Sequence, residues 1–281
     1  MHLSVIVPPG CEDLLIGEGT PVKSVMCFAN IAWENKEYRH WYAEYRGWKV
    51  MDNEIYEGKP PLDPSKLAVM MWAIQPDVLI VPDVRGDVEQ TIMYAGEYLP
   101  RLHASLNKDP YNNTVNLCGV VQGKTSLEIE RCMWFWVDKI MVGEVQMVAV
   151  PMRVDGREMS RRQVYEEIVR PLLPSRAKVH LLGVEKWPYM DEQELARYPE
   201  VVSCDTAEPT SAALRGVLIS NEGAGDAVRR PDRFMEDDSI KVILRGSKER
   251  LWRNFSRVQD KFMGPRATRM ASSPTDAPTT E

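Results

Sequence analysis

Short apolar runs recur along the first two hundred residues, and longer stretches with helical spacing of their apolar positions lie between them. Runs that are rich in β-branched residues and end at Pro, Gly or Asp predict strands. The expected strands occupy residues 3–7, 25–28, 48–52, 78–83, 115–123, 145–150, 179–184 and 201–207. Because strands alternate with helical segments, the pattern indicates parallel β/α units.

Capping residues mark where several of the intervening helices begin. Asp63 followed by Pro64 is an N-cap and first-turn pair. Capping boxes are predicted at Thr125-x-x-Glu128 and Ser160-x-x-Gln163. The aromatic residues between Trp33 and Trp48 have roughly helical spacing, which favours a core-facing stripe over a base-stacking platform.

Polar side chains stand at the ends of four expected strands: Asp52, Asp83, Gln122 and Asp205. A closed barrel assembles one site from the carboxyl ends of separate strands. The sequence therefore predicts an α/β fold of the TIM-type (β/α)8 class, with an irregular N-terminal strand and a basic C-terminal helix as additions. An open doubly wound sheet is the competing fold, but no G-x-G-x-x-G or Walker sequence follows any strand.

Composition fits one barrel domain over residues 1–269, followed by a disordered tail at 270–281 that holds mainly Ala, Ser, Pro and Thr. The chain has 281 residues, of which 44% are hydrophobic, and its net charge is −6. Residues 229–269 nevertheless hold twelve Lys or Arg against six Asp or Glu, including an expected basic helix at 247–262. Residues 240–244 are a further strand candidate.

Cysteine spacing and hydropathy indicate in which cellular compartment the protein is expected. The five cysteines form no C-x-x-C pair and no cluster with histidine, so neither a zinc site nor a disulfide framework is expected. No apolar run is long enough to span a bilayer, and no signal peptide precedes the first strand. We expect a soluble, cytoplasmic protein without membrane partners. His40, His103 and His180 lack metal-ligand spacing and receive no role.

The run Val201 to Ala207 predicts a buried strand that carries Asp205 to the mouth of a loop, where barrel enzymes keep reacting groups. Asp205 is therefore the candidate centre of the chemistry. The alternative is that it caps the next helix or ends a strand. Similar alternatives apply to the other residues: Asp52 and Asp83 as caps or ion-pair partners, Tyr56 as a half-buried core residue, and Gln122 as a hydrogen-bonding loop residue.

Four phrases, in order along the chain, resemble the tRNA-guanine transglycosylase superfamily. They are Met51-Asp52-Asn53-Glu54-Ile55-Tyr56-Glu57-Gly58, Val81-Pro82-Asp83-Val84-Arg85-Gly86-Asp87, Val121-Gln122-Gly123 and His180-Leu181-Leu182-Gly183-Val184, and Asp205 with Pro209-Thr210 follows them. Within the superfamily, the chain looks more like the phage and bacterial branch that inserts 7-deazaguanine bases into DNA.

The resemblance implies a base exchange in which Asp205 attacks C1′ of a guanosine and forms a covalent intermediate. It implies that Asp52 is the general acid and base. Further implied roles are stacking of the base between Tyr56 and Leu182 with Gly183 beside it, and recognition of the guanine edge by Asp83 and Gln122 with Gly123. The implied partners are DNA and a free 7-deazaguanine base such as preQ0 or preQ1.

Departures from the family pattern bear on the polymer substrate. Members that act on tRNA carry a C-x-C-x-x-C…His zinc site after the nucleophile, whereas no cysteine follows Cys204 here, so no cofactor is expected. Ser211 replaces the arginine of the tRNA-acting members, and Val148-Ala149-Val150-Pro151 replaces a glycine-rich turn, which leaves the contacts to the 7-substituent open. Phosphate contacts from Arg250, Arg253 and Arg257 are expected in the basic helix.

Other functions stay open from the sequence. The same chemistry on tRNA or another RNA keeps every catalytic residue. A catalytically silent nucleic-acid-binding paralogue is a further hypothesis, against which the presence of both Asp52 and Asp205 argues, because an inert paralogue has no chemical reason to hold both. A barrel hydrolase of small nucleosides would release free base without an incoming one. The sequence also leaves open whether the protein forms a homodimer or works with accessory modification proteins.

Overall fold

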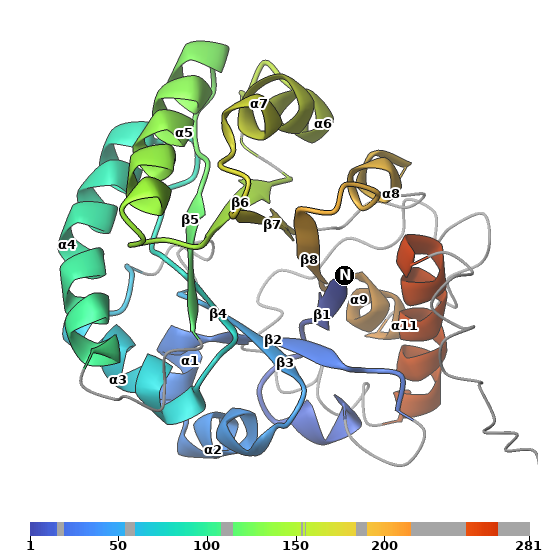
Figure 1. The fold of residues 1–281 in the computed structure, drawn as a ribbon. Helices are drawn as coiled ribbons and strands as arrows, with labels where there is room; N and C mark the ends of the chain where they lie inside the picture. The colour runs from blue at the N-terminus through green and yellow to red at the C-terminus, as the bar shows by residue number, and fades with distance from the viewer. Residues whose placement is uncertain are drawn as a thin grey trace, which may run out of the picture.

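The protein folds as a closed barrel of eight parallel strands (Figure 1). The computed structural model describes residues 1–15, 20–53, 60–107, 115–152, 154, 156–183, 190–214 and 246–263. The strands are β1 (His2–Val5), β2 (Ser24–Phe28), β3 (Trp48–Asp52), β4 (Val78–Ile80), β5 (Asn116–Val120), β6 (Met147–Pro151), β7 (Lys178–Leu182) and β8 (Val201–Thr206). Each strand pairs with the next in sequence, and β8 pairs with β1, so the predicted (β/α)8 class is confirmed and the open sheet was the wrong alternative.

Helices surround this barrel on its outer side (Figure 1). They are α1 (Ala29–Glu34), α2 (Lys36–Glu44), α3 (Pro64–Ile74), α4 (Val88–Leu106), α5 (Ser126–Met141), α6 (Arg161–Gln163), the π-helical segment η3 (Val164–Val169), α7 (Arg170–Leu172), α8 (Met190–Leu195) and α9 (Glu208–Leu214). The predicted N-cap Asp63 and the two predicted capping boxes are all formed. Local capping chemistry therefore fixes these helix starts as the sequence indicated.

Strands β4 and β5 end three residues earlier than their apolar runs suggested. The Val81 amide still donates to the Cys118 carbonyl at 2.9 Å, but Pro82 has no amide hydrogen and the ladder stops there. Asp83 consequently lies on the loop after β4, where its side chain is no longer constrained by the pleat of the strand.

Successive side chains along each strand point to opposite faces, and this divides the buried residues into two cores. One side of each strand faces the helices, where Tyr38 and Tyr42 of the aromatic segment are fully buried, as predicted. The other side fills the barrel interior. Its apolar members include Ile6, Met26, Phe28, Val50, Val78, Ile80, Cys118, Val120, Met147, Ala149 and Ala207.

Strands β1, β2, β7 and β8 also carry polar side chains into the barrel interior, beside apolar ones such as Met26 and Phe28. The Ser4 and Ser24 hydroxyls lie 2.6 Å apart, and His180, Ser203 and Asp205 are buried on the adjoining strands. Buried polar groups need hydrogen-bond partners, and here the two serine hydroxyls pair with each other while His180 bonds to both Ser203 and Asp205.

The basic helix is α11 (Lys248–Met263), which packs against α9 outside the barrel (Figure 1). Its Leu251, Phe255 and Val258 side chains are buried. The Trp252 indole donates to the Leu14 carbonyl at 2.7 Å, which joins α11 to the 3-10 turn η1 (Glu12–Leu15) after β1. In this way α11 covers the barrel beside the β1–β2 connection, whose described residues form only that short turn.

Several sequence predictions lie outside the described residues. They concern the strand candidate at 240–244, most of the basic segment 229–269 before α11, and the tail at 270–281. Within the described part of the chain, no helix combines the length and apolar character needed to cross a bilayer.

Candidate active site at the carboxyl end of the barrel

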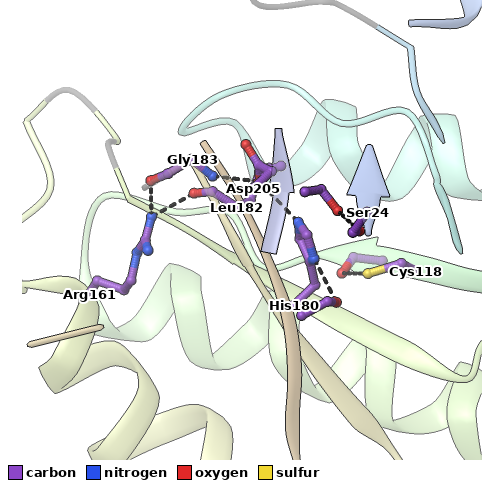
Figure 2. Close-up of polar contacts among 10 residues, drawn as sticks. Ser24, Cys118, Arg161, His180, Leu182, Gly183 and Asp205 are labelled. Carbon is purple, nitrogen blue, oxygen red and sulfur yellow. Dashed lines mark hydrogen bonds and ion pairs between the residues drawn. The ribbon is translucent and has the colours of Figure 1, made fainter. Parts of the chain in front are cut away.

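Asp205 lies near the end of β8 and is 3% exposed. Its Oδ1 oxygen accepts two hydrogen bonds, from His180 Nε2 at 3.0 Å and from the Gly183 amide at 2.8 Å (Figure 2). No hydrogen bond from the described residues reaches Oδ2. One oxygen of the carboxylate is therefore fixed by two donors, and the other is left for a different interaction.

His180 connects Asp205 to a second buried side chain. Its Nδ1 atom lies 2.8 Å from the Ser203 hydroxyl, and the side chains of His180 and Ser203 are both fully buried. In the sheet, His180 pairs with Ser203, which places the two side chains side by side on the inner face. Ser203 has no access to a substrate, so this Ser–His–Asp series is not a serine nucleophile with its base.

The loop after β7 is held from outside the barrel by Arg161 of α6, which is 4% exposed. Its guanidinium donates to the carbonyls of Leu182 and Gly183 (Figure 2). Gly183 has φ +70°, a conformation that other residues rarely adopt, and this aims its amide at Asp205. Arg161 and Gly183 together position the amide donor of the site.

Asp83 and Gln122 are joined at the ends of β4 and β5. Gln122 Nε2 donates to Asp83 Oδ2 at 2.6 Å, and Gln122 Oε1 accepts from the Gly86 amide at 2.9 Å. The Gln122 side chain is 2% exposed and retains one Nε2 hydrogen beyond these bonds. Gly123 has φ +143°, and a Cβ there would lie 2.7 Å from the Ile129 amide nitrogen, so this turn requires glycine.

Two acidic groups on this side influence one another. Burial, and secondly the negative charge of Asp52, raise the pKa of Asp83 from its usual 3.8 to about 7, although the hydrogen bond from Gln122 opposes the increase. Burial also raises the pKa of the Cys118 thiol, which the charges of Asp83 and Asp52 raise further. The thiol therefore stays protonated, and the carboxyl groups are the reactive candidates on this wall.

The two groups of residues come from opposite walls of the barrel. In a closed barrel of eight strands, β4 lies four strands from β8 in either direction. Asp83 follows β4, and Asp205 lies on β8, so the acidic pair and the hydrogen-bonded carboxylate face each other across the carboxyl end. Carboxyl groups whose environments differ in this way can divide acid and nucleophile roles between them.

The structure also decides between some of the alternatives that the sequence left open. Asp87 and not Asp83 is the N-cap of α4, because Asp87 accepts from the Gln90 amide. Asp205 bonds to β7 and its loop and does not cap α9. Asp52 Oδ1 accepts from the adjacent Asn53 amide at 2.7 Å. Gln122 is a loop hydrogen-bonder, as one interpretation held, and also contacts Asp83.

Four predicted residues are not brought into this network. Tyr56 lies outside the described residues. Arg253 and Arg257 are exposed on α11, where Arg253 pairs with Glu249, and Arg250 contacts the Ser247 hydroxyl at 3.4 Å. In the part of the chain that the structure describes, no hydrogen bond connects these arginines to Asp205.

Sequence reasoning gave no role to three residues of this site: His180, Ser203 and Arg161. His180 received no role because its spacing from the other histidines is not that of metal ligands. A usable signal was the two-residue period of a strand, because His180 and Leu182 share one face of β7, as do Ser203 and Asp205 on β8. The register between the two strands, which only the fold supplies, brings them together.

Among the described residues, no group of three or more His, Cys, Asp or Glu is arranged to hold a metal ion. Comparison of the sequence with protein-family models finds no matching family. A comparison with curated proteins likewise finds no match. The functional assignment therefore depends on the chemistry of the site and on the resemblance of the ordered phrases described above.

Proposed function

We propose that the protein is a DNA-guanine transglycosylase that exchanges guanine in DNA for a free 7-deazaguanine base. The observation that carries the proposal is the Asp205 carboxylate, which has one oxygen held by two donors and stands opposite the Asp52 and Asp83 pair. A β/α barrel of this class is a common enzyme scaffold with its chemistry at this end.

In the proposed first step, Asp205 Oδ2 forms a bond to C1′ as the bond from C1′ to guanine N9 breaks. Departure of the base develops positive charge on the sugar, and a nearby carboxylate stabilises that charge before it bonds. Oδ1 becomes the carbonyl oxygen of the resulting ester. In the second step, N9 of the incoming base attacks C1′ and releases the carboxylate.

The residues opposite Asp205 transfer protons and recognise the edge of the base. Asp52 protonates the departing guanine and later takes a proton from the incoming base. Asp83 in its ionised form accepts from N1–H and the 2-amino group, and Gln122 offers its remaining Nε2 hydrogen to O6. Leu182, with the Gly183 turn, forms one face of the base pocket, and Tyr56 is assigned the other.

A DNA substrate is supported by the basic helix and by the missing cysteine module. Arg250, Arg253 and Arg257 follow one another at three- and four-residue spacing, which places them on one face of α11. The opposite face of the helix is buried, so this face is available for phosphate contacts. The target nucleotide must leave its stack to reach the barrel end.

The proposal is tested by nucleoside mass spectrometry after purified protein is incubated with free 7-deazaguanine bases and either DNA or tRNA. Incorporation into DNA alone is the expected result and identifies the base. Incorporation into tRNA alone would move the activity to RNA. Release of guanine without incorporation would indicate a hydrolase, and no reaction with intact DNA binding would indicate a silent paralogue.

The Asp205→Ala variant tests the nucleophile. We expect exchange to fall by at least about 10³-fold, because the covalent route is removed. The covalent protein–DNA adduct, which a denaturing gel detects, should disappear as well. Asp138→Ala, which removes an exposed carboxylate on α5, is the matched control. Exchange at the wild-type rate in the folded Asp205→Ala protein would refute this assignment.

A further inference from the structure

The buried network beneath Asp205 holds a histidine that the proposed chemistry does not yet use. His180 is fully buried, with Nε2 on Asp205 Oδ1 at 3.0 Å and Nδ1 on the Ser203 hydroxyl at 2.8 Å (Figure 2). Burying an imidazole is costly unless both ring nitrogens have hydrogen-bond partners. Here both have one, and one of them is the candidate nucleophile.

We propose that His180, held by Ser203, is a positioning residue that fixes Oδ1 of Asp205 and so presents Oδ2 to the sugar. The proposal deepens the transglycosylase function and rests on it. An ionised carboxylate can only accept, so Nε2 must carry the hydrogen. In the neutral imidazole the Ser203 hydroxyl then donates to Nδ1, and this second bond fixes the tautomer.

The arrangement explains why two donors converge on the same oxygen. The His180 ring approaches Oδ1 from within the barrel, and the Gly183 amide approaches it from the loop after β7. Two donors from different elements restrict rotation of the carboxylate about its χ2 torsion. They also remain bonded to Oδ1 when it becomes the ester carbonyl, where hydrogen bonds make the carboxylate a better leaving group in the second step.

Two substitutions distinguish a hydrogen bond donated by residue 180 to Asp205 from a role of that side chain in packing alone. In His180→Gln the side-chain amide nitrogen can reach the place of Nε2 and donate to Oδ1. In His180→Asn the shorter amide reaches only the place of Nδ1, near Ser203. Both variants keep a polar side chain in the cavity, and His40→Asn on the exposed surface of α2 is the control.

We expect His180→Asn to lower the rate of adduct formation by about 10- to 100-fold, the effect of removing one hydrogen bond to a charged group. His180→Gln should recover most of that rate, and KM should change little in both variants, because the ring does not contact the base. Equal rates in wild-type protein and the folded His180→Asn variant would overturn the proposal. So would equal reductions in both His180 variants.

A second measurement does not depend on activity. Nitrogen-15 correlation spectra of histidine-labelled protein report which ring nitrogen of His180 is protonated, and the His180→Gln spectrum assigns the signal. We expect a hydrogen on Nε2 whose resonance shifts in Asp205→Asn. A bare Nε2 would overturn the positioning role. If wild-type protein exchanges no base while this signal is present, the proposed function fails and the hydrogen-bond assignment stands.

Discussion

The pH dependence of the free energy of unfolding gives a direct test of the raised pKa of Asp83. Burial and the charge of Asp52 raise its pKa from 3.8 to about 7 in the folded protein. Below about pH 4 the carboxyl group is protonated in both the folded and unfolded chains. Between pH 4 and 7 it ionises in the unfolded chain but keeps its proton in the folded one, so the free energy of unfolding falls as the pH rises.

The size of this decrease follows from the two pKa values. The interval from 3.8 to about 7 corresponds to about 4 kcal/mol when both states are ionised. Asp83 is only partly buried by its surface area, and water reduces the penalty, so we expect about 2 kcal/mol in practice. The neutral, nearly isosteric Asp83→Asn variant escapes this decrease and can still accept the hydrogen bond from Gln122.

The measurement is urea unfolding of wild type and Asp83→Asn at fixed pH values from 4 to 8, followed by tryptophan fluorescence. The difference in unfolding free energy should shift by about 2 kcal/mol in favour of the variant as the pH rises, and level off above pH 7. Asp138→Asn on the exposed surface of α5 is the control for removal of one carboxylate. Parallel curves for wild type and Asp83→Asn across this range would refute the reasoning.

The remaining predictions concern packing and polymer binding. Gly119→Ala should lower the free energy of unfolding by about 1–3 kcal/mol in thermal or urea unfolding, because its Cβ would lie 2.3 Å from the buried Trp136 ring. Gly96→Ala within α4 meets nothing within 4 Å and should be neutral or slightly stabilising, and equal behaviour of the two variants would contradict the packing argument. Changing Arg253 and Arg257 to Gln should weaken DNA binding, as measured by fluorescence anisotropy. The slope of log K against log salt concentration should fall by about one unit for each phosphate that is no longer neutralised. Unaltered binding would remove α11 from the interface.

Local features of the sequence determined much of the architecture. Apolar runs, strand-ending polar residues and capping boxes act over a few residues, so they predicted the strands of the barrel and the starts of α3, α5 and α6 without any tertiary information. The same pattern placed Asp52, Asp83, Gln122 and Asp205 at strand ends. Because parallel strands of one barrel end at one rim, this was enough to predict that they gather on the same side.

Only the tertiary structure determined the hydrogen bonds and the pKa shifts of those residues. The register between β7 and β8 places His180 beside Ser203 and within hydrogen-bond distance of Asp205, although more than twenty residues separate them in sequence. The raised pKa of Asp83 depends on burial and on Asp52 from another strand. Such effects arise from distances between segments far apart in the chain, and no local pattern of residues encodes those distances.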